Sequence, residues 1–190
     1  MPGKPIGKPV TGSGMAAGLA PDAVSLASMI TDCQIRLGLP ADARQIAAMS
    51  RDYIEHGLGW RWTPSRITAA LRAPDSNLAV ACRGTQVVGF GLMQYKDDEA
   101  HLVLLAVDAG SRRAGVATAL LAWLERCALV AGIGTVYLEA RTANTAARAF
   151  YRKLGYREIA RVPGYYQGVE DGVRIARDLW LPPEGPPTSD

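Results

Sequence analysis

The residues with the clearest chemical potential form a glycine-containing turn between an apolar run and a long helical pattern. The apolar run covers residues 102–107, the turn covers residues 108–115, and the helical pattern starts at Val116. The backbone N–H groups in the first turn of a helix have no partner within the helix, so an anion there gains several donors and the positive end of the helix dipole. Gly115 lets the backbone approach such an anion closely. The spacing indicates a phosphate site.

Two common phosphate loops fit this turn poorly. Gly110 and Gly115 have the separation of a Walker A loop, but Val116 and Ala117 stand where that loop needs Lys and then Ser or Thr. A dinucleotide fingerprint needs Gly-x-Gly-x-x-Gly, which the turn lacks, although Glu139 at the end of the next apolar run mimics its ribose-binding acid. An ordinary strand-to-helix turn with solvated arginines stays open.

Two segments resemble the GNAT superfamily of acetyltransferases. Arg112–Ala117 resembles the loop, Gln or Arg followed by Arg-x-Gly-x and then Gly or Ala, with which these enzymes bind the pyrophosphate of acetyl-coenzyme A. Residues 137–156 resemble the family's signature Leu-Glu-Val-Arg-x-x-Asn-x-x-Ala-x-x-Leu-Tyr-x-x-x-Gly-Phe, with the bacterial ribosomal-protein alanine N-acetyltransferases as the best match. Arg112 stands where many relatives have Gln, and Ala117 replaces the second Gly. The resemblance implies an N-acetyltransferase that uses acetyl-CoA.

In that family the residue matching Glu139 is the general base and the residue matching Tyr151 is the general acid. An amine that is mostly protonated at pH 7 must lose a proton before it attacks a thioester, and a carboxylate can accept that proton through a water. A phenol beside the sulfur can protonate the departing thiolate. The alternatives are an ion pair of Glu139 with Arg141 or Arg148, and a purely structural core role for Tyr151.

The resemblance also implies which residues contact the cofactor. The backbone of the apolar strand pairs with the pantetheine amides, and one of its amides would polarise the thioester carbonyl. The loop surrounds the pyrophosphate, and an asparagine makes a further contact. The implied cofactor-binding residues are Leu105, Ala106, Val107, Arg113, Ala114, Gly115, Val116, Ala117, Thr118 and Asn144.

The acceptor is less defined by the sequence. Tyr165 and Tyr166, followed by Glu170-Asp171, resemble elements that line the peptide path in protein N-terminal acetyltransferases. Gly172 replaces the usual Ala, and the aromatic loop Gly57–Trp62 has no clear counterpart. We therefore expect direct transfer to a primary amine, with a protein N-terminal α-amine as the first expectation. A small-molecule amine, or a non-catalytic CoA-binding sensor module, stays open.

Other reactive side chains are not assigned to catalysis. His56 and His101 are each isolated in the sequence and are interpreted as structural or surface groups. Three cysteines, far apart and without a nearby histidine, favour neither a disulfide framework nor a zinc site, and no metal is expected. Cys127 is expected to pack on the buried stripe of a helix.

Hydrophobic periodicity predicts strands at residues 33–37, 78–83, 87–96, 101–107, 135–140, 156–162 and 173–181. Helices are predicted from Leu39 to about Glu55, from Thr63 to about Arg72, from Val116 to about Ala131 and from Thr145 to Leu154. We expect Tyr53 on the buried side of the first helix and Glu125 on the outer side of the third. This is the GNAT order, which implies an α/β (α+β) fold with a mixed, mostly antiparallel sheet of about seven strands and about four helices.

The composition bounds the remaining classes. The chain has 190 residues, of which 48% are hydrophobic and 21% charged, which suits one domain with a sizeable core. The net charge of +3 is too mild to predict nucleic-acid binding, and no apolar run or leader predicts a membrane or secreted protein, so we expect a cytoplasmic one. The expected division is a flexible extension at residues 1–31, the acetyltransferase domain at 32–181 and a tail at 182–190. A monomer or a homodimer is open.

Overall fold

One mixed sheet organises the protein, in the strand order β1-β2-β3-β4-β5-β7-β6. The computed structural model describes residues 33–181, so the predicted extension and tail lie outside the described residues. The strands are β1 (Gln34–Leu37), β2 (Ser76–Arg83), β3 (Gln86–Lys96), β4 (Glu99–Val107), β5 (Thr135–Arg141), β6 (Arg157–Tyr166) and β7 (Glu170–Asp178). The helices are α2 (Ala43–Tyr53), α3 (Pro64–Arg72), α4 (Val116–Val130) and α5 (Thr145–Lys153), with short 3-10 turns at Pro40–Asp42 and Ala109–Ser111.

The predicted element order and the mixed, mostly antiparallel sheet are confirmed. The last hairpin is different from the prediction, because β6 continues to Tyr166 and β7 starts at Glu170. The turn between them needs left-handed backbone only at Gln167 and Gly168, with φ of 58° and 74°. Strand pairing thus reaches through most of the segment that the sequence assigned to a loop.

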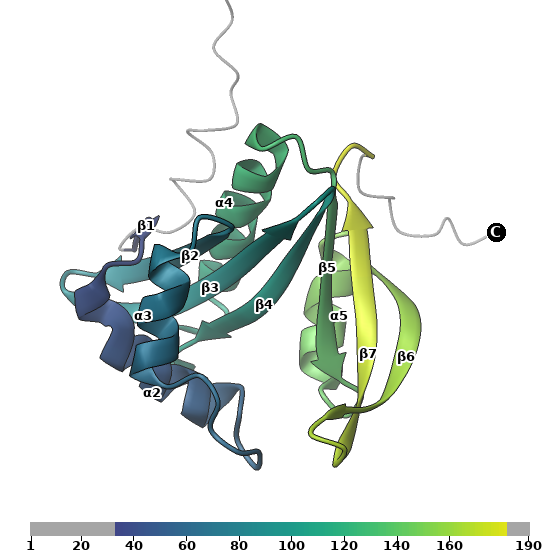
Figure 1. Cartoon of the computed structure of the whole chain (residues 1–190), viewed down its shortest axis with the longest axis horizontal. Helices are drawn as coiled ribbons and strands as arrows, with labels where there is room; N and C mark the ends of the chain where they lie inside the picture. Colours follow the sequence, from purple (N-terminus) through teal and green to yellow (C-terminus); the bar gives the residue numbers. More distant parts are fainter. Residues whose placement is uncertain (1–32, 182–190) are drawn as a thin grey trace, which may run out of the picture.

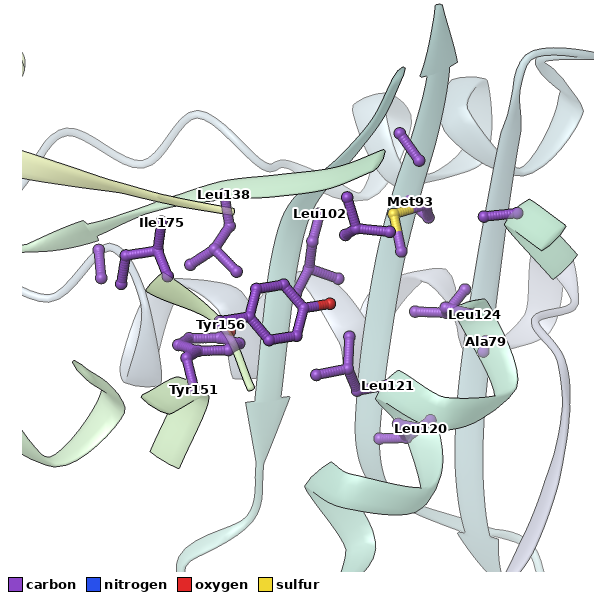
Figure 2. Packing of buried hydrophobic residues seen from close by; sticks show 14 of the residues in the cluster. Ala79, Met93, Leu102, Leu120, Leu121, Leu124, Leu138, Tyr151, Tyr156 and Ile175 are labelled. Atoms are coloured by element: carbon purple, nitrogen blue, oxygen red, sulfur yellow. The ribbon is translucent and has the colours of Figure 1, made fainter. Parts of the chain in front are cut away.

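Two hydrophobic layers cover the two faces of the sheet. Helices α2 and α3 pack over β2, β3 and β4, and Ile46, Ile67 and Phe90 are completely buried between them. Helix α4 and Tyr151 of α5 lie on the opposite face, where Leu120, Leu124 and their neighbours fill the second layer (Figure 2). Tyr53 is 38% exposed, so its predicted place on the buried side of α2 is wrong.

Side chains of helix α4 lie directly over two glycines of β3. A Cβ atom on Gly91 would lie 2.8 Å from Cδ1 of Leu124, and one on Gly89 would lie 3.1 Å from side chains of Leu120 and Val116. A larger residue there would force these α4 side chains to shift. Since the turn before α4 carries the predicted phosphate site, these glycines set the height of that site above the sheet.

A bulge in β4 changes which of its residues face which layer. Leu92 of β3 pairs with Leu104 and Met93 pairs with Leu102, so Val103 is the extra residue. Strict alternation would put Leu102 and Leu104 on one face. Instead Leu102 belongs to the α4 layer and Leu104 to the α2 layer. The bulge turns Leu105 toward the α4 side, and the side chains after Val103 face the opposite layers from those that strict alternation would give.

Strands β4 and β5 pair over a short distance and then separate. In their parallel register Glu99 pairs with Thr135, Ala100 with Val136 and His101 with Tyr137, and the pairing ends there. Beyond His101 the two strands diverge, and the sheet opens into a V in Figure 1. The edge of β4 that would face β5 is therefore not paired by it from Leu102 onward. That edge borders the site described below.

The expectation that Glu125 faces outward is wrong. Its carboxylate accepts hydrogen bonds from Tyr156 Oη at 2.7 Å and Arg177 Nη1 at 3.2 Å, and its side chain is 13% exposed. Burial raises the pKa of Glu125, although both partners oppose the rise. The polar group links α4 to the hairpin of β6 and β7.

Truncating a fully buried side chain of α4 should be costly. Leu124→Ala removes a side chain that is 0% exposed and leaves a cavity against Gly91, so we expect about 2–5 kcal/mol less free energy of unfolding. Urea denaturation followed by circular dichroism measures the change. Val130→Ala, at a side chain that is 91% exposed on the same helix, should stay within about 0.5 kcal/mol of the wild type. Equal losses in both variants would contradict this packing.

Candidate functional site

A cleft with a volume of about 470 Å³ lies where β4 and β5 separate. Its floor comes from residues 101–105 of β4 and 138–141 of β5, and its walls come from the end of α2, from α5 and from the β6–β7 hairpin. Glu139, Tyr151, Asn144, Leu105, Tyr165 and Tyr166 all line it. The structure thus brings both predicted catalytic residues, both predicted acceptor-side tyrosines and two of the predicted cofactor contacts to one place.

Glu139 is the polar centre of the cleft. Its Oε2 atom is 2.8 Å from His101 Nε2 and accepts a hydrogen bond from Tyr165 Oη at 2.8 Å. Its Oε1 atom accepts from Arg174 Nε at 2.8 Å. The side chain of Glu139 is only 2% exposed. Three partners from three different strands therefore enclose one carboxylate.

These contacts hold the Glu139 carboxylate in its charged form. Burial alone raises its pKa, but the hydrogen bonds from His101, Tyr165 and Arg174 outweigh burial and lower the pKa to about 2. Glu139 is therefore an anion across the physiological pH range. A carboxylate with so low a pKa has little intrinsic affinity for a proton.

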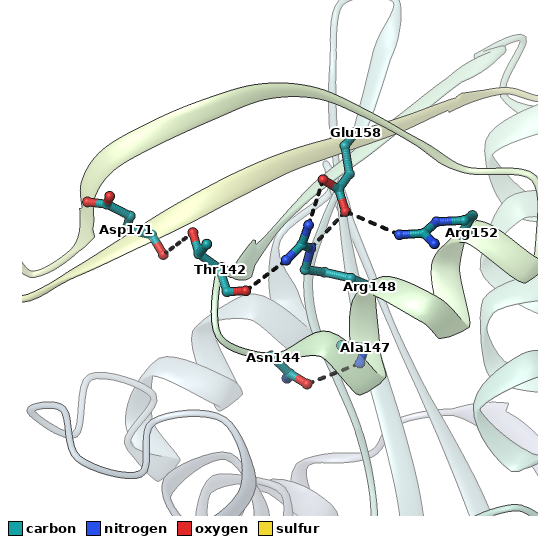
Figure 3. A network of polar contacts seen from close by, with 7 residues as sticks. All are labelled: Thr142, Asn144, Ala147, Arg148, Arg152, Glu158 and Asp171. Atoms are coloured by element: carbon teal, nitrogen blue, oxygen red, sulfur yellow. Dashed lines mark hydrogen bonds and ion pairs between the residues drawn. The ribbon is translucent and has the colours of Figure 1, made fainter.

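The alternative ion-pair partners predicted for Glu139 are wrong. Arg141 donates to Glu170 Oε2 at 2.9 Å, and Arg148 donates to both carboxylate oxygens of Glu158, at 2.7 and 3.0 Å. Figure 3 shows Arg148 reaching from α5 to Glu158 on β6, away from the cleft. Glu139 instead pairs with Arg174, which lies directly opposite it in the β5–β7 register.

Tyr151 lines the cleft from the other side of the sheet. The residue is 7% exposed, and its ring packs edge-on against Phe150 and Tyr156 (Figure 2). Burial raises the pKa of its phenol well above the ordinary value, with a smaller contribution from Tyr166. The Tyr151 hydroxyl therefore keeps its proton at neutral pH and is a donor at the cleft wall.

Tyr165 and Tyr166 come from the end of β6 and both reach β5. Tyr165 donates to the Glu139 carboxylate, while Tyr166 Oη donates to the Glu139 carbonyl oxygen at 3.0 Å. Burial raises the pKa of Tyr166 to about 12. Gly172 makes room for this arrangement, because a Cβ atom there would lie 3.1 Å from Tyr165 Cβ. The glycine that departs from the family pattern thus fits the position of Tyr165.

The aromatic loop and the last hairpin meet at the rim of the cleft. Gln167 forms two hydrogen bonds with the Gly59 backbone, at 3.2 and 3.1 Å. Arg141 Nη2 donates to the carbonyl oxygens of Ile54 and His56, at 3.0 and 2.9 Å. The loop between α2 and α3 is thereby fastened to β5 and to the hairpin, and the two segments lie beside the predicted acceptor-side tyrosines.

The predicted phosphate turn lies at the start of α4. Gly115 is the N-cap residue with φ of 80°, and Arg113 also has a positive φ of 60°. Arg113, Ala114, Gly115, Val116, Ala117 and Thr118 lie past the end of β4 and do not line the cleft itself. Arg112 donates through Nε to the Val107 carbonyl at 3.2 Å and lies over the Tyr53 ring. The left-handed turn leaves the first N–H groups of α4 pointing out of the helix end.

The other predicted cofactor contacts occupy β4 and α5. Leu105 lines the cleft, whereas Ala106 and Val107 are buried in the two hydrophobic layers, so only their backbone edge is available. Asn144 caps α5, since its Oδ1 atom accepts from Ala147 N at 3.0 Å (Figure 3). The side-chain Oδ1 atom of Asn144 therefore has a structural role as the helix cap.

Two residues of the site were not found from the sequence. His101 was interpreted from the sequence as a structural or surface group, and the structure places it within hydrogen-bond distance of Glu139. Arg174 was not singled out at all. Both lie more than thirty positions from Glu139, and only the strand register brings them together. An arginine between the buried Val173 and Ile175 was the one available signal.

Two absences concern residues 33–181 only. Within that range the structure has no cluster of three or more histidine, cysteine or acidic side chains able to hold a metal ion. The helices of the same range also include none with the length and apolarity to cross a membrane.

Comparison with known proteins identifies the family. Residues 44–156 match the acetyltransferase (GNAT) family, so the chain belongs to that family. It is 37% identical over 93 residues to an N-acetyltransferase of Methanocaldococcus jannaschii, and 36% identical over 94 residues to the ribosomal protein bS18-alanine N-acetyltransferase of Escherichia coli. Each match covers 48% of this chain, and the matches cover 60% and 64% of those relatives.

Solved structures show the same fold. Ard1 from Thermoplasma volcanium superposes with a TM-score of 0.69 and 28% identity, covering 78% of this chain and 98% of that one. The Escherichia coli ribosomal-protein-S18-alanine N-acetyltransferase superposes with a TM-score of 0.67 and 24% identity, covering 83% and 99%. The predicted GNAT fold is confirmed.

The charge of Glu139 should make the stability of the folded protein depend on pH. Its pKa is depressed in the folded state from the ordinary 4.5 to about 2, so its contacts stabilise the fold above pH 4.5 and lose that effect as the pH falls toward 2. Glu139→Gln should therefore be less stable than the wild type at pH 7, and the gap should narrow between pH 4.5 and 2. Chemical denaturation across this range measures it. Glu99→Gln, at an exposed carboxylate on β4, is the matched control. A gap independent of pH would contradict the assignment.

Proposed function

We propose that this protein transfers the acetyl group of acetyl-CoA to a primary amine, directly within a ternary complex, and that a protein N-terminal α-amine is its acceptor. The observation that carries the proposal is the convergence of Glu139, Tyr151 and Tyr165 on one cleft at the split between β4 and β5. Family membership and the names of the matched relatives support the reaction class.

The residues present fit acetyl-CoA. The β4 edge beyond His101 is not paired by β5, so its backbone groups can bond an extended amide chain. The left-handed Gly115 opens the helix terminus toward a pyrophosphate. Leu105–Val107, Arg113–Thr118 and Asn144 would hold the cofactor, which supplies an activated acetyl group. Metal chemistry has no part in this proposal.

Tyr151 is the proposed general acid. Its phenol keeps its proton at neutral pH because burial raises its pKa, and it lies at the wall of the cleft, where it can donate to a departing thiolate. Glu139 is proposed to provide general-base catalysis through a group bonded to it. Its negative charge attracts a cationic amine to the cleft and stabilises the positive charge that the bonded group carries once it has taken up the amine's proton.

A protein N-terminus is favoured over a small amine by the acceptor side of the cleft. Tyr165 and Tyr166 flank Glu139, and the Gln167–Gly59 contact fastens two loops across the rim. A rim built from two chain segments and a tyrosine pair gives an extended peptide surfaces to lie against. The names of two relatives support this acceptor: a ribosomal protein bS18-alanine N-acetyltransferase in Escherichia coli and an N-alpha-acetyltransferase in Sulfurisphaera tokodaii.

Release of the coenzyme A thiol tests the function. We expect release with peptides that carry an unblocked N-terminus and none with the same peptides after N-terminal formylation. Release with polyamines alone would replace the proposed acceptor by a small amine. If acetyl-CoA raises the melting temperature of the protein but neither peptides nor polyamines cause thiol release, the protein is a CoA-binding sensor module. That result would overturn the enzyme assignment.

Removing the Tyr151 hydroxyl should slow the reaction. Tyr151→Phe keeps the ring packing against Phe150 and Tyr156, so we expect a fall in kcat of at least roughly 100-fold with little change in the melting temperature or in acetyl-CoA binding. Steady-state kinetics with the best peptide measures the effect. Tyr95→Phe removes a hydroxyl bonded to Asn77 outside the cleft and should leave kcat unchanged. Full turnover by Tyr151→Phe would remove the assignment.

A further inference from the structure

We propose that His101 is the residue that takes the proton from the acceptor amine, and that Glu139 acts through it by holding and polarising its ring. The inference deepens the proposed function and rests on it. Its basis is a geometric contrast between two neighbouring side chains at the base of the cleft.

Glu139 is close to the acceptor space but is not open to it. Its side chain is 2% exposed, whereas the His101 side chain bonded to it is 25% exposed. An amine entering the cleft therefore meets the imidazole before it meets the carboxylate. A proton bound for Glu139 has to pass through one of the groups that cover it.

The other groups that cover Glu139 cannot accept a proton near neutral pH. Arg174 is a cation that is never deprotonated under these conditions. Tyr165 already donates its hydroxyl proton to Glu139, and burial together with that contact raises the pKa of the phenol. An imidazole is the one type of group in this set that ordinarily titrates between pH 5 and 8.

The structure fixes which nitrogen is available. His101 Nε2 lies 2.8 Å from Glu139 Oε2, and an ionised carboxylate only accepts hydrogen bonds, so Nε2 carries the proton. The lone pair of the neutral ring is then on Nδ1. The ring stacks on Tyr137 with centroids 4.5 Å apart and planes 5° apart, and Arg174 lies 5.3 Å from the same Tyr137 ring. The orientation of the imidazole is therefore fixed by its hydrogen bond to Glu139 and by its stacking on Tyr137.

The charged and titratable groups that face this ring come from three strands. Glu139 and Tyr137 lie on β5, Arg174 on β7 and Tyr165 on β6. On the β3 side the residue paired with His101 is the uncharged Gln94. The Glu139 carboxylate lies in direct contact with the ring, so an anion is already in place beside the positive charge that the ring carries after it has accepted a proton.

The proton transfer balances without any further reactant. One N–H bond of the acceptor ammonium breaks and an Nδ1–H bond forms, directly or through one water. The electron pair of the broken bond stays on the amine nitrogen, which becomes the nucleophile. The positive charge moves to the imidazolium and is paired with Glu139. His101 then returns the proton to solvent.

The pH dependence of His101→Gln tests this role. Glutamine keeps a donor toward Glu139 but cannot take up a proton. We expect kcat/KM at pH 7 to fall roughly 10- to 100-fold. In the wild type the acid limb of kcat/KM should lie below the titration of the peptide α-amine, because the enzyme supplies the base. In His101→Gln the limb should move up to the titration of the peptide α-amine, near pH 7.7–8.0, because only amine that is already neutral can react. The deficit should therefore shrink above pH 8.

The chain has two histidines, so His56→Gln is the matched control for the pH profile. The acid limb should keep its wild-type position in His56→Gln; if it moves there and not in His101→Gln, the proposal is overturned. His101→Ala with added imidazole gives a second test, in which we expect imidazole to restore part of the rate. The melting temperature and the acetyl-CoA-induced shift should match the wild type in these variants. An unaltered acid limb in a folded His101→Gln refutes the role of His101 alone, whereas no thiol release by the wild type refutes the proposed function.

Discussion

The separation of β4 from β5 is the constraint on which the site depends. Two parallel strands that start side by side would normally continue to pair, and each would satisfy the other's backbone groups. Here the pairing stops at His101 and Tyr137, and the bulge at Val103 follows immediately in β4. The divergence creates both the cleft and an unpaired backbone edge beside it. A ligand that carries its own amides is the natural partner for such an edge.

The same divergence explains why the polar groups gather where they do. The last paired residues of β4 and β5, His101 and Tyr137, lie close together at the base of the cleft. Glu139 follows Tyr137 by two residues in β5. Its carboxylate contacts His101 of β4, Arg174 of β7 and Tyr165 of β6 at hydrogen-bond distance. An enclosed carboxylate with three donors is rigid, so it holds a charge at a fixed point and positions its neighbours.

Packing on the far face supports this geometry. The glycines of β3 let α4 lie close to the sheet, and the buried contacts of Leu120 and Leu124 fix the helix there. The start of α4 is thereby held at a set distance from the end of β4. On the other half of the sheet, Tyr151 is held by its aromatic neighbours. The proposed phosphate turn and the proposed acid are thus positioned by one hydrophobic layer.

The sequence by itself determined the order of the elements, the family and the residues of the two segments that resemble it, because these depend on local periodicity and on spacing along the chain. Glu139, Tyr151 and the turn at Gly115 could all be found in this way. Tertiary structure alone decided which groups surround Glu139, because His101 and Arg174 reach it through strand register across long sequence separations. It also decided which layer each residue of β4 faces, since one bulged residue inverts the side-chain alternation within a run that is apolar throughout.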